Sequence, residues 1–428
     1  MTRLAAPAEP HLRRIALGSL LLLPLALLHG RAVAEILTSL IGIAFLLHCA
    51  LAGDWAWLRR PWLALPLLFW AWIVLCTACG PWGQKAVVQA VVALRYWMLL
   101  PALEIWLLRP GLLHASLARR WLWLLVAASL AWIGAQCWLQ YLVGVNLFGW
   151  PRWGDGALTG PFYGPRAGSP YALLLYPALL PPVMALLGRP RWPARLAGVG
   201  LAMLGIATLI LIGQRMPALL GLFGLGVAGL LLPRFRPAVL AALALGVALV
   251  AALPVVSPPA YQKLVVRFLD QMGHFPTSDY GQIYIRAATM VEGRPGLGFG
   301  ILGFREACAD PRWAAAPALD VPQLRNPDGT SAGCALHPHN FWLEAAVDGG
   351  LPGLVLFAAV CGLILWRAGG RLGGDPLRVG LFAAVLVKLW PLAATNSFYA
   401  QPMAGWSFLV IGWALALRAD APGQAHRP

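Results

Sequence analysis

Residues 237–257 read PAVLAALALGVALVAALPVVS, an apolar run without a charged side chain. The hydrocarbon core of a membrane requires about 20 consecutive apolar residues for each helical crossing. The same character extends along the chain, because 60% of its 428 residues are hydrophobic and only 11% are charged. We therefore predict an all-α polytopic membrane protein.

Apolar segments of this kind recur between Ile15 and Leu417, with one long interruption after residue 257. The sequence predicts about 12 transmembrane helices. The predicted spans are 14–30, 32–53, 61–80, 86–108, 121–144, 169–188, 195–213, 216–232, 237–257, 341–366, 377–395 and 398–418. The first span has no small-residue cleavage site at its end, so we expect it to be retained.

The cations give the predicted spans an orientation, because Lys and Arg are retained on the cytoplasmic side of short loops. Arginines gather at one side of the spans. They are Arg3, Arg13, Arg14, Arg59, Arg60, Arg109, Arg119, Arg120, Arg189, Arg191, Arg195, Arg234, Arg236, Arg367, Arg371, Arg378, Arg418 and Arg427. Both termini are therefore predicted to be cytoplasmic. These arginines account for most of the net charge of +16, and at the cytoplasmic ends of the spans they meet anionic headgroups. We therefore expect no nucleic-acid binding.

The segment 258–338 is long enough to form a small domain on the opposite side. The predicted organisation is transmembrane helices 1–9 in residues 1–257, a large and mainly helical periplasmic loop domain in 258–338, and helices 10–12 in 339–428. The cations of the loop are either solvated surface charges or ligands of an anion: Lys263, Arg267, Arg286, Arg294, Arg305, Arg312 and Arg325. A disulfide between Cys308 and Cys334 is one of two open alternatives for this pair.

Polar residues mark the start of the tenth span. His337-Pro338-His339-Asn340 precedes it, and Asn340, Glu344 and Asp348 recur at four-residue spacing along one helical face. Because histidine titrates near neutrality, His339 could accept a proton from a hydroxyl nucleophile or donate a hydrogen bond to phosphate. His-x-His is also a spacing of metal ligands, which leaves a metal site as the weaker alternative.

Other charges stand in or beside the spans. Arg215-Met216-Pro217 begins the eighth span, where a guanidinium and free backbone N–H groups point to an anion. Arg95, Glu104 and Lys388 lie within predicted spans, and each should face a partner or a wet cavity. Lys388 is the most suggestive of a cavity that opens outward. The run Gly296–Gly300 lacks the context of a nucleotide-binding motif and predicts a tight turn near the bilayer.

Three of these motifs resemble those of the O-antigen ligase family. Arg215-Met216-Pro217-Ala218-Leu219 resembles its Arg-x3-Leu motif, and His339-Asn340 with Gly350 and Gly353 resembles its His-[Asn/Ser/Gln]-x9-Gly-x-x-Gly motif. Arg286, followed by Arg294-Pro295-Gly296-Leu297-Gly298-Phe299-Gly300, resembles its loop segment with an Arg and then Pro-x-x-Gly-x-Gly. The profile of about twelve helices with a large loop before the His motif is similar as well.

The resemblance implies an inverting, metal-independent glycosyl transfer at the periplasmic face of a bacterial inner membrane, with no cofactor. The donor would be a polysaccharide on undecaprenyl pyrophosphate, and the acceptor a hydroxyl of the lipid A core oligosaccharide. His339 would be the catalytic base, with His337 as second choice, and Arg215 and Arg286 would bind the pyrophosphate. Asn340, Glu344 and Lys388 would support them. The alternatives are an O-antigen polymerase or a protein O-oligosaccharyltransferase of the same superfamily and, in another class, a transporter of lipid-linked glycans.

Overall fold

The structure is a computed structural model, and it describes residues 5–164, 166–313, 333–370, 372–393 and 396–418. Regular structure in these ranges is helical, and they contain no β-strand. The prediction of an all-α polytopic membrane protein is confirmed. Four of the cations discussed above, Arg3, Arg325, Arg371 and Arg427, lie outside the described residues.

Nine helical segments within the described ranges are long and apolar enough to cross a membrane. They are α1 (Ala5–His29), α2 (Arg31–Ala52), α3 (Pro61–Ala78), the run of α4 (Gly83–Val92), α5 (Leu94–Pro101) and η2 (Ala102–Leu107), α6 (Ala115–Val143), α7 (Gly168–Leu187), α8 (Trp192–Leu211), η3 (Pro233–Phe235) with α10 (Arg236–Val256), and α15 (Phe341–Gly369). Three shorter helices occupy the other predicted spans: α9 (Arg215–Leu231), α16 (Pro376–Leu389) and α17 (Met403–Arg418).

The last two predicted spans are too long. α16 ends at Leu389 instead of residue 395, and α17 begins at Met403 instead of residue 398. Proline explains both ends, because the residue before a proline is disfavoured in the α conformation. Trp390, which precedes Pro391, is extended with φ −61° and ψ 133°. The connection between α16 and α17 is therefore irregular, and its described part packs beside the start of α15.

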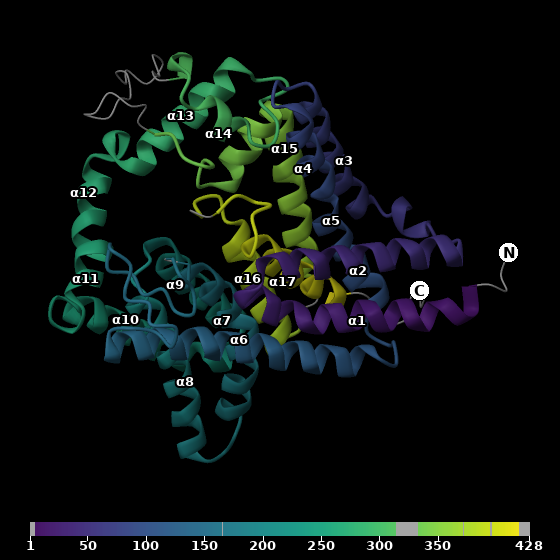
Figure 1. The fold of residues 1–428 in the computed structure, drawn as a ribbon. Helices are drawn as coiled ribbons and strands as arrows, with labels where there is room; N and C mark the ends of the chain where they lie inside the picture. The colour runs from purple at the N-terminus through teal and green to yellow at the C-terminus, as the bar shows by residue number, and fades with distance from the viewer. Residues whose placement is uncertain (1–4, 165, 314–332, 371, 394–395, 419–428) are drawn as a thin grey trace.

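The described residues of segment 258–338, called the loop domain below, form a chain of short helices. They are α11 (Pro258–Tyr261), η4 (Gln262–Val266), α12 (Arg267–Gly273), η5 (Phe275–Thr277), α13 (Asp279–Gly293), α14 (Gly303–Ala307) and η6 (Pro311–Trp313). One further short turn, η1 (Ala56–Arg59), lies outside the loop domain. Met290, Phe299 and Phe304 form part of a separate apolar core, and a disulfide joins Cys308 to Cys334. Figure 1 shows α11 and α12 rising along one side and α13 and α14 crossing above the other helices.

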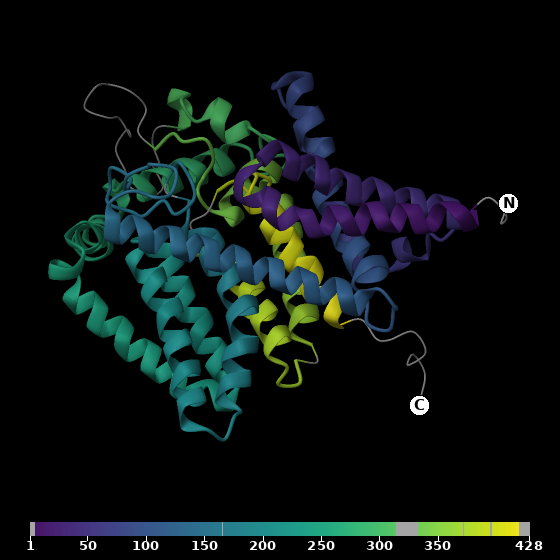
Figure 2. The same ribbon diagram turned by 60° about the horizontal axis from the view of Figure 1, so that its bottom comes forward.

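Close backbone contact holds the long helices together. α7 packs against α6, α8 and α16, and Figure 2 shows α6 running between the α1–α2 pair and the group of α7 to α10. A Cβ atom on Gly380 of α16 would lie 2.6 Å from the carbonyl oxygen of Tyr176 on α7. Small residues allow membrane helices to approach in this way. The charges predicted within spans are paired, since Arg95 contacts Glu35 at 3.6 Å and Glu104 contacts Arg367 at 2.7 Å.

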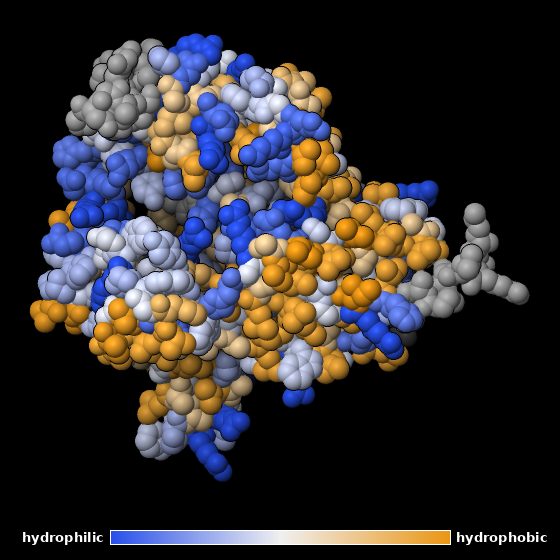
Figure 3. Space-filling view, in the orientation of Figure 1, coloured by the Kyte–Doolittle hydropathy of each residue, from blue (hydrophilic) through white to orange (hydrophobic). Residues whose placement is uncertain are grey.

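The surface is divided by polarity. Figure 3 shows apolar side chains gathered over α1, α2 and the helices beside them, and hydrophilic side chains over the loop domain. The same face is hollowed between the loop domain and the helices below it, and hydrophilic side chains surround this hollow.

Candidate active site

Asn340 fixes the start of α15. Its side-chain oxygen accepts hydrogen bonds from the backbone N–H groups of Trp342 and Leu343, at 2.9 and 3.1 Å, which is the geometry of an N-cap. Its amide nitrogen donates to the carbonyl oxygen of Pro391 at 2.5 Å. The same amide thus joins α15 to the segment after α16, which sets the position of the histidine just before it.

His339 has an unusual backbone conformation. Its φ is 53°, in the left-handed region that few residues other than glycine adopt. The centroid of its ring lies 4.3 Å from that of His337 and 5.8 Å from that of Tyr280 on α13. A left-handed residue held between a helix cap and an aromatic ring is the kind of local strain that persists at functional sites.

Arg215 reaches from the first residue of α9 to the loop domain. Its Nε donates to the carbonyl oxygen of Lys263 at 2.6 Å, and one terminal nitrogen donates to the side chain of Gln271 on α12. Its charge also interacts with the hydroxyl group of Tyr280. The guanidinium is therefore directed out of the helical bundle and toward the loop domain.

Tyr280 lies beside both predicted residues, and sequence reasoning missed it. Burial raises the pKa of its hydroxyl group, and the charge of Arg215 opposes that rise. The side chain keeps 38% of its surface exposed, so a ligand can reach it. Tyr284 lies one turn further along α13, where burial raises its pKa and a hydrogen bond to Asn340 opposes the rise. The sequence offered one signal for this pair. Tyr280 and Tyr284 are four residues apart, and residues at that spacing lie on the same face of a helix.

Arg286 has a different setting from Arg215. Its side chain is fully buried, and one terminal nitrogen donates to the carbonyl oxygen of Cys308 at 2.6 Å. Burial lowers the pKa of its guanidinium. Six residues separate it from Tyr280, which places the two roughly 240° apart around α13. The side chain thus supports the interior of the loop domain, and its contact with a pyrophosphate stays a prediction.

The glycines of two motifs form one backbone seam. The N–H groups of Phe299 and Gly300 donate to the carbonyl oxygens of Val347 and Asp348, both at 2.8 Å, and the N–H of Leu351 donates to Pro295 at 2.7 Å. Gly350 has φ 66° and ψ −166°, a conformation confined to glycine, and it kinks α15 at this place. A tight turn is expected at 296–300. The chain turns at 295–297, where the N–H of Gly298 donates to the carbonyl oxygen of Arg294 at 3.1 Å, and residues 299–300 then dock on the kink.

Replacing Gly298 by alanine is expected to destabilise the protein by about 2 kcal/mol or more. Gly298 has φ +61°, and a Cβ atom there would lie 2.5 Å from both the backbone nitrogen of Gly350 and the carbonyl oxygen of Val347. Gly296→Ala is the matched control, because no atom lies within 4 Å of its Cβ position. Thermal unfolding in detergent measures the difference. Equal melting temperatures for the two variants would refute the seam as a stabilising contact.

Glu344 and Lys388 form the deeper part of this region. Glu344 accepts hydrogen bonds from the hydroxyl of Ser397 at 2.5 Å and from the N–H of Phe398 at 2.8 Å. The ammonium of Lys388 lies 4.5 Å from the ring centroid of Phe341, and its charge interacts with Glu344. Glu344 therefore holds the α16–α17 connection against α15. The predicted face of Asn340 and Glu344 meets neighbouring protein segments.

Lys388 also lines a cavity of about 30 Å³ together with Ser169, Pro217 and Leu220. Such a volume accommodates about one water molecule. The cavity joins the start of α9, which carries Arg215, to the helix that carries Lys388. The prediction that Lys388 faces a partner or a cavity is met by both kinds of contact.

Residues 200–358 match the family model described as O-antigen ligase. These 159 of the 428 residues are therefore similar to the O-antigen ligase family. The matched O-antigen ligase segment runs from within α8 to within α15, so it contains Arg215, the whole loop domain and His339. A search of curated proteins found no match to the chain. The O-antigen ligase match thus covers the elements that meet at Tyr280. The apolar helices of the described ranges indicate a multi-pass membrane protein.

Proposed function

We propose that the protein is an O-antigen ligase that transfers O-antigen polysaccharide from undecaprenyl pyrophosphate to the lipid A core oligosaccharide. The family match supports the enzyme class. The observation that carries the proposal is the position of Tyr280, which lies beside the ring of His339 and within the charge field of Arg215. The Arg215 motif and the His339 motif, which are far apart in the sequence, thus both lie near the partly exposed side chain of Tyr280.

The proposed chemistry is a single displacement that inverts the anomeric carbon. The acceptor hydroxyl attacks that carbon, its proton passes to His339, and the bond to the pyrophosphate oxygen breaks. The leaving group is already a stable anion, so cationic groups that stabilise its growing charge replace a general acid. Arg215 takes this part, with Arg286 as the second proposed pyrophosphate ligand. Planar guanidinium groups suit phosphate oxygens because they donate in pairs.

The proposed site faces the periplasm, and the proposed location is the bacterial inner membrane with both termini in the cytoplasm. The support is the gathering of arginines at the other rim of the spans, as positive charge is retained on the cytoplasmic side. The hollow between the apolar helices and the hydrophilic loop domain suits two lipid-linked substrates, whose sugars are polar and whose lipids are apolar.

The testing experiment reconstitutes the full chain in vesicles with a labelled glycan on undecaprenyl pyrophosphate and offers three acceptors in parallel. We expect covalent product with lipid A core oligosaccharide. Product only with a second lipid-linked repeat unit would establish a polymerase instead, and product only with a protein acceptor would establish an oligosaccharyltransferase. Movement of the labelled lipid between leaflets without any covalent product would refute transfer and favour a transporter.

Strong chelators are expected to leave this transfer rate unchanged, because the proposed roles fall to arginine and histidine side chains. Within the described ranges, no group of three His, Cys, Asp or Glu side chains is arranged to hold a metal ion. The measurement compares initial rates with and without chelator in the same vesicles. Loss of activity that added zinc restores would revive the His337–His339 metal site.

A further inference from the structure

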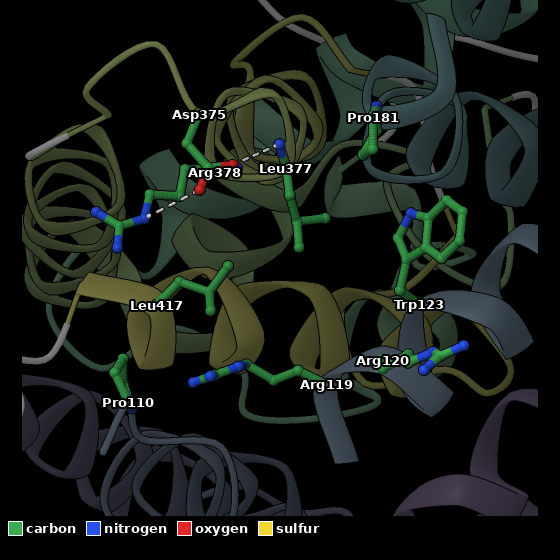
Figure 4. A pocket seen from close by; sticks show the side chains of 9 residues that line it. All are labelled: Pro110, Arg119, Arg120, Trp123, Pro181, Asp375, Leu377, Arg378 and Leu417. Carbon is green, nitrogen blue, oxygen red and sulfur yellow. Dashed lines mark hydrogen bonds and ion pairs between the residues drawn. The ribbon is translucent and has the colours of Figure 1, made fainter. Parts of the chain in front are cut away.

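A pocket of about 430 Å³ opens where α6, α7, α16 and α17 meet. Arg119, Arg120 and Trp123 line it from α6, and Arg378 lines it from α16. Figure 4 shows Arg119 and Arg378 extending toward the same end of the pocket, with Trp123 and Arg120 at the other end. The pocket thus combines three guanidinium groups with the ends of four apolar helices.

Arginines outnumber carboxylates among the described residues that line this pocket. Asp375 is the one carboxylate among the lining residues, and it lies 3.7 Å from Arg378. The same carboxylate also accepts from the N–H groups of Leu377 and Arg378 as the N-cap of α16. Arg119 donates to a neutral acceptor, the carbonyl oxygen of Leu108, at 3.1 Å. Since the charges of Arg119 and Arg378 also repel each other, an anion between them would relieve that repulsion.

This pocket is separate from the candidate active site. It adjoins the first residues of α16, whereas Lys388 and the connection held by Glu344 adjoin the last. Fourteen residues of α-helix span about 20 Å, which is much of the thickness of a hydrocarbon core. The pocket therefore lies at the opposite rim of the helical bundle, where the arginines of the short loops gather.

The walls of the pocket are apolar. Leu377, Leu417, Pro110 and Pro181 line it beside the indole of Trp123, whose N–H donates to the carbonyl oxygen of Pro177 at 3.0 Å. Tryptophan at the end of a membrane span is placed at headgroup level. A soluble phosphate would use the guanidinium groups alone, whereas a phospholipid would use both the cations and the apolar walls.

We propose that this pocket binds the headgroup phosphate of an anionic glycerophospholipid from the leaflet at the arginine-rich rim. Guanidinium groups bind phosphate oxygens through paired hydrogen bonds, and basic pockets between transmembrane helices suit anionic headgroups. The glyceride part lies against Leu377 and Leu417, and the acyl chains continue into the bilayer. The bound lipid stabilises the junction of α6 with α16 and α17.

The test uses the purified full chain and measures the retention of dioleoyl phosphatidylglycerol and of dioleoyl phosphatidylcholine by native mass spectrometry. Wild type is expected to retain the anionic lipid about tenfold more strongly than the zwitterionic one. The double variant Arg119→Gln/Arg120→Gln should lose this preference, and Arg120→Gln alone should reduce it severalfold. Arg189→Gln/Arg191→Gln is the matched control, because it removes two exposed arginines from the α7–α8 connection and should keep the preference.

The outcomes separate the lipid from other anions and from misfolding. Added phosphatidylglycerol should raise the melting temperature of wild type and of the control variant, but not that of Arg119→Gln/Arg120→Gln. Equal stabilisation by inorganic phosphate at the same concentration would refute the assignment of a lipid and would show a site for soluble phosphate instead. Equal lipid preference in all variants, including the correctly folded Arg120→Gln, would overturn the proposal altogether.

Discussion

Replacement of His339 by asparagine is expected to reduce the rate of glycosyl transfer by about 10²–10⁴-fold, the usual contribution of a general base. Asparagine is chosen because His339 has a φ of 53°, and asparagine tolerates this left-handed conformation better than alanine does. The variant removes the basic ring nitrogen and leaves the backbone conformation in place. Initial rates under saturating donor and acceptor measure the loss.

His337→Asn is the matched control, since the two rings are neighbours with centroids 4.3 Å apart. We expect it to keep much more activity than His339→Asn, with both melting temperatures close to that of wild type. Added imidazole should partly restore transfer by His339→Asn if a missing base causes the loss. Near-normal transfer by that variant would refute the assignment of the base.

Arg215→Ala is expected to lower kcat/KM for the lipid-pyrophosphate donor by about 10²–10³-fold, the loss typical of removing one group that stabilises developing negative charge. The KM for the acceptor should change little, because the proposed contact is with the leaving group. Arg215→Lys should recover only part of the loss. A lysine keeps the charge but lacks the planar set of donors with which Arg215 contacts both Lys263 and Gln271.

A structural role for Arg215 has to be separated from a chemical one, because its contacts join α9 to the loop domain. Gln271→Ala removes one of those contacts without removing the guanidinium. We expect Gln271→Ala to lower the melting temperature by part of the loss that Arg215→Ala causes, while it retains most of the transfer rate. Similar losses of rate in both variants would show that Arg215 acts through the docking of the loop domain alone.

The sequence predicted the helices well because burial in a membrane is a property of composition along the chain. Every predicted span lies on a helix, and the last two spans are too long at prolines, where α16 stops before Pro391 and α17 begins after Pro402. The first and fifth spans are too short, since α1 begins at Ala5 and α6 at Ala115. The pairing of Arg95 with Glu35 followed from the cost of an isolated charge, although the partner itself had to be read from the fold.

The candidate site was predicted less completely. Motif residues Arg215 and His339 could be named, but their common neighbour could not, because Tyr280 approaches them only after the loop domain folds over the helices. Arg286 looked equivalent to Arg215 in sequence, and its burial against the Cys308 carbonyl depends on the packing of α13 on α14 and the disulfide. The surroundings of these residues depend on contacts between segments that lie far apart in the sequence.

The backbone seam between 295–300 and the kink of α15 limits how this protein can be recombined with a relative. Three main-chain hydrogen bonds and three glycines with positive φ, Gly298, Gly300 and Gly350, occupy the two sides of one joint. A loop domain grafted from another chain would have to pack on a kink of a different sequence, unless the residues from His337 to Gly353 were transferred together with it. The exchangeable unit is therefore the loop domain together with the first half of α15, and a functional chimera should be cut after the kink.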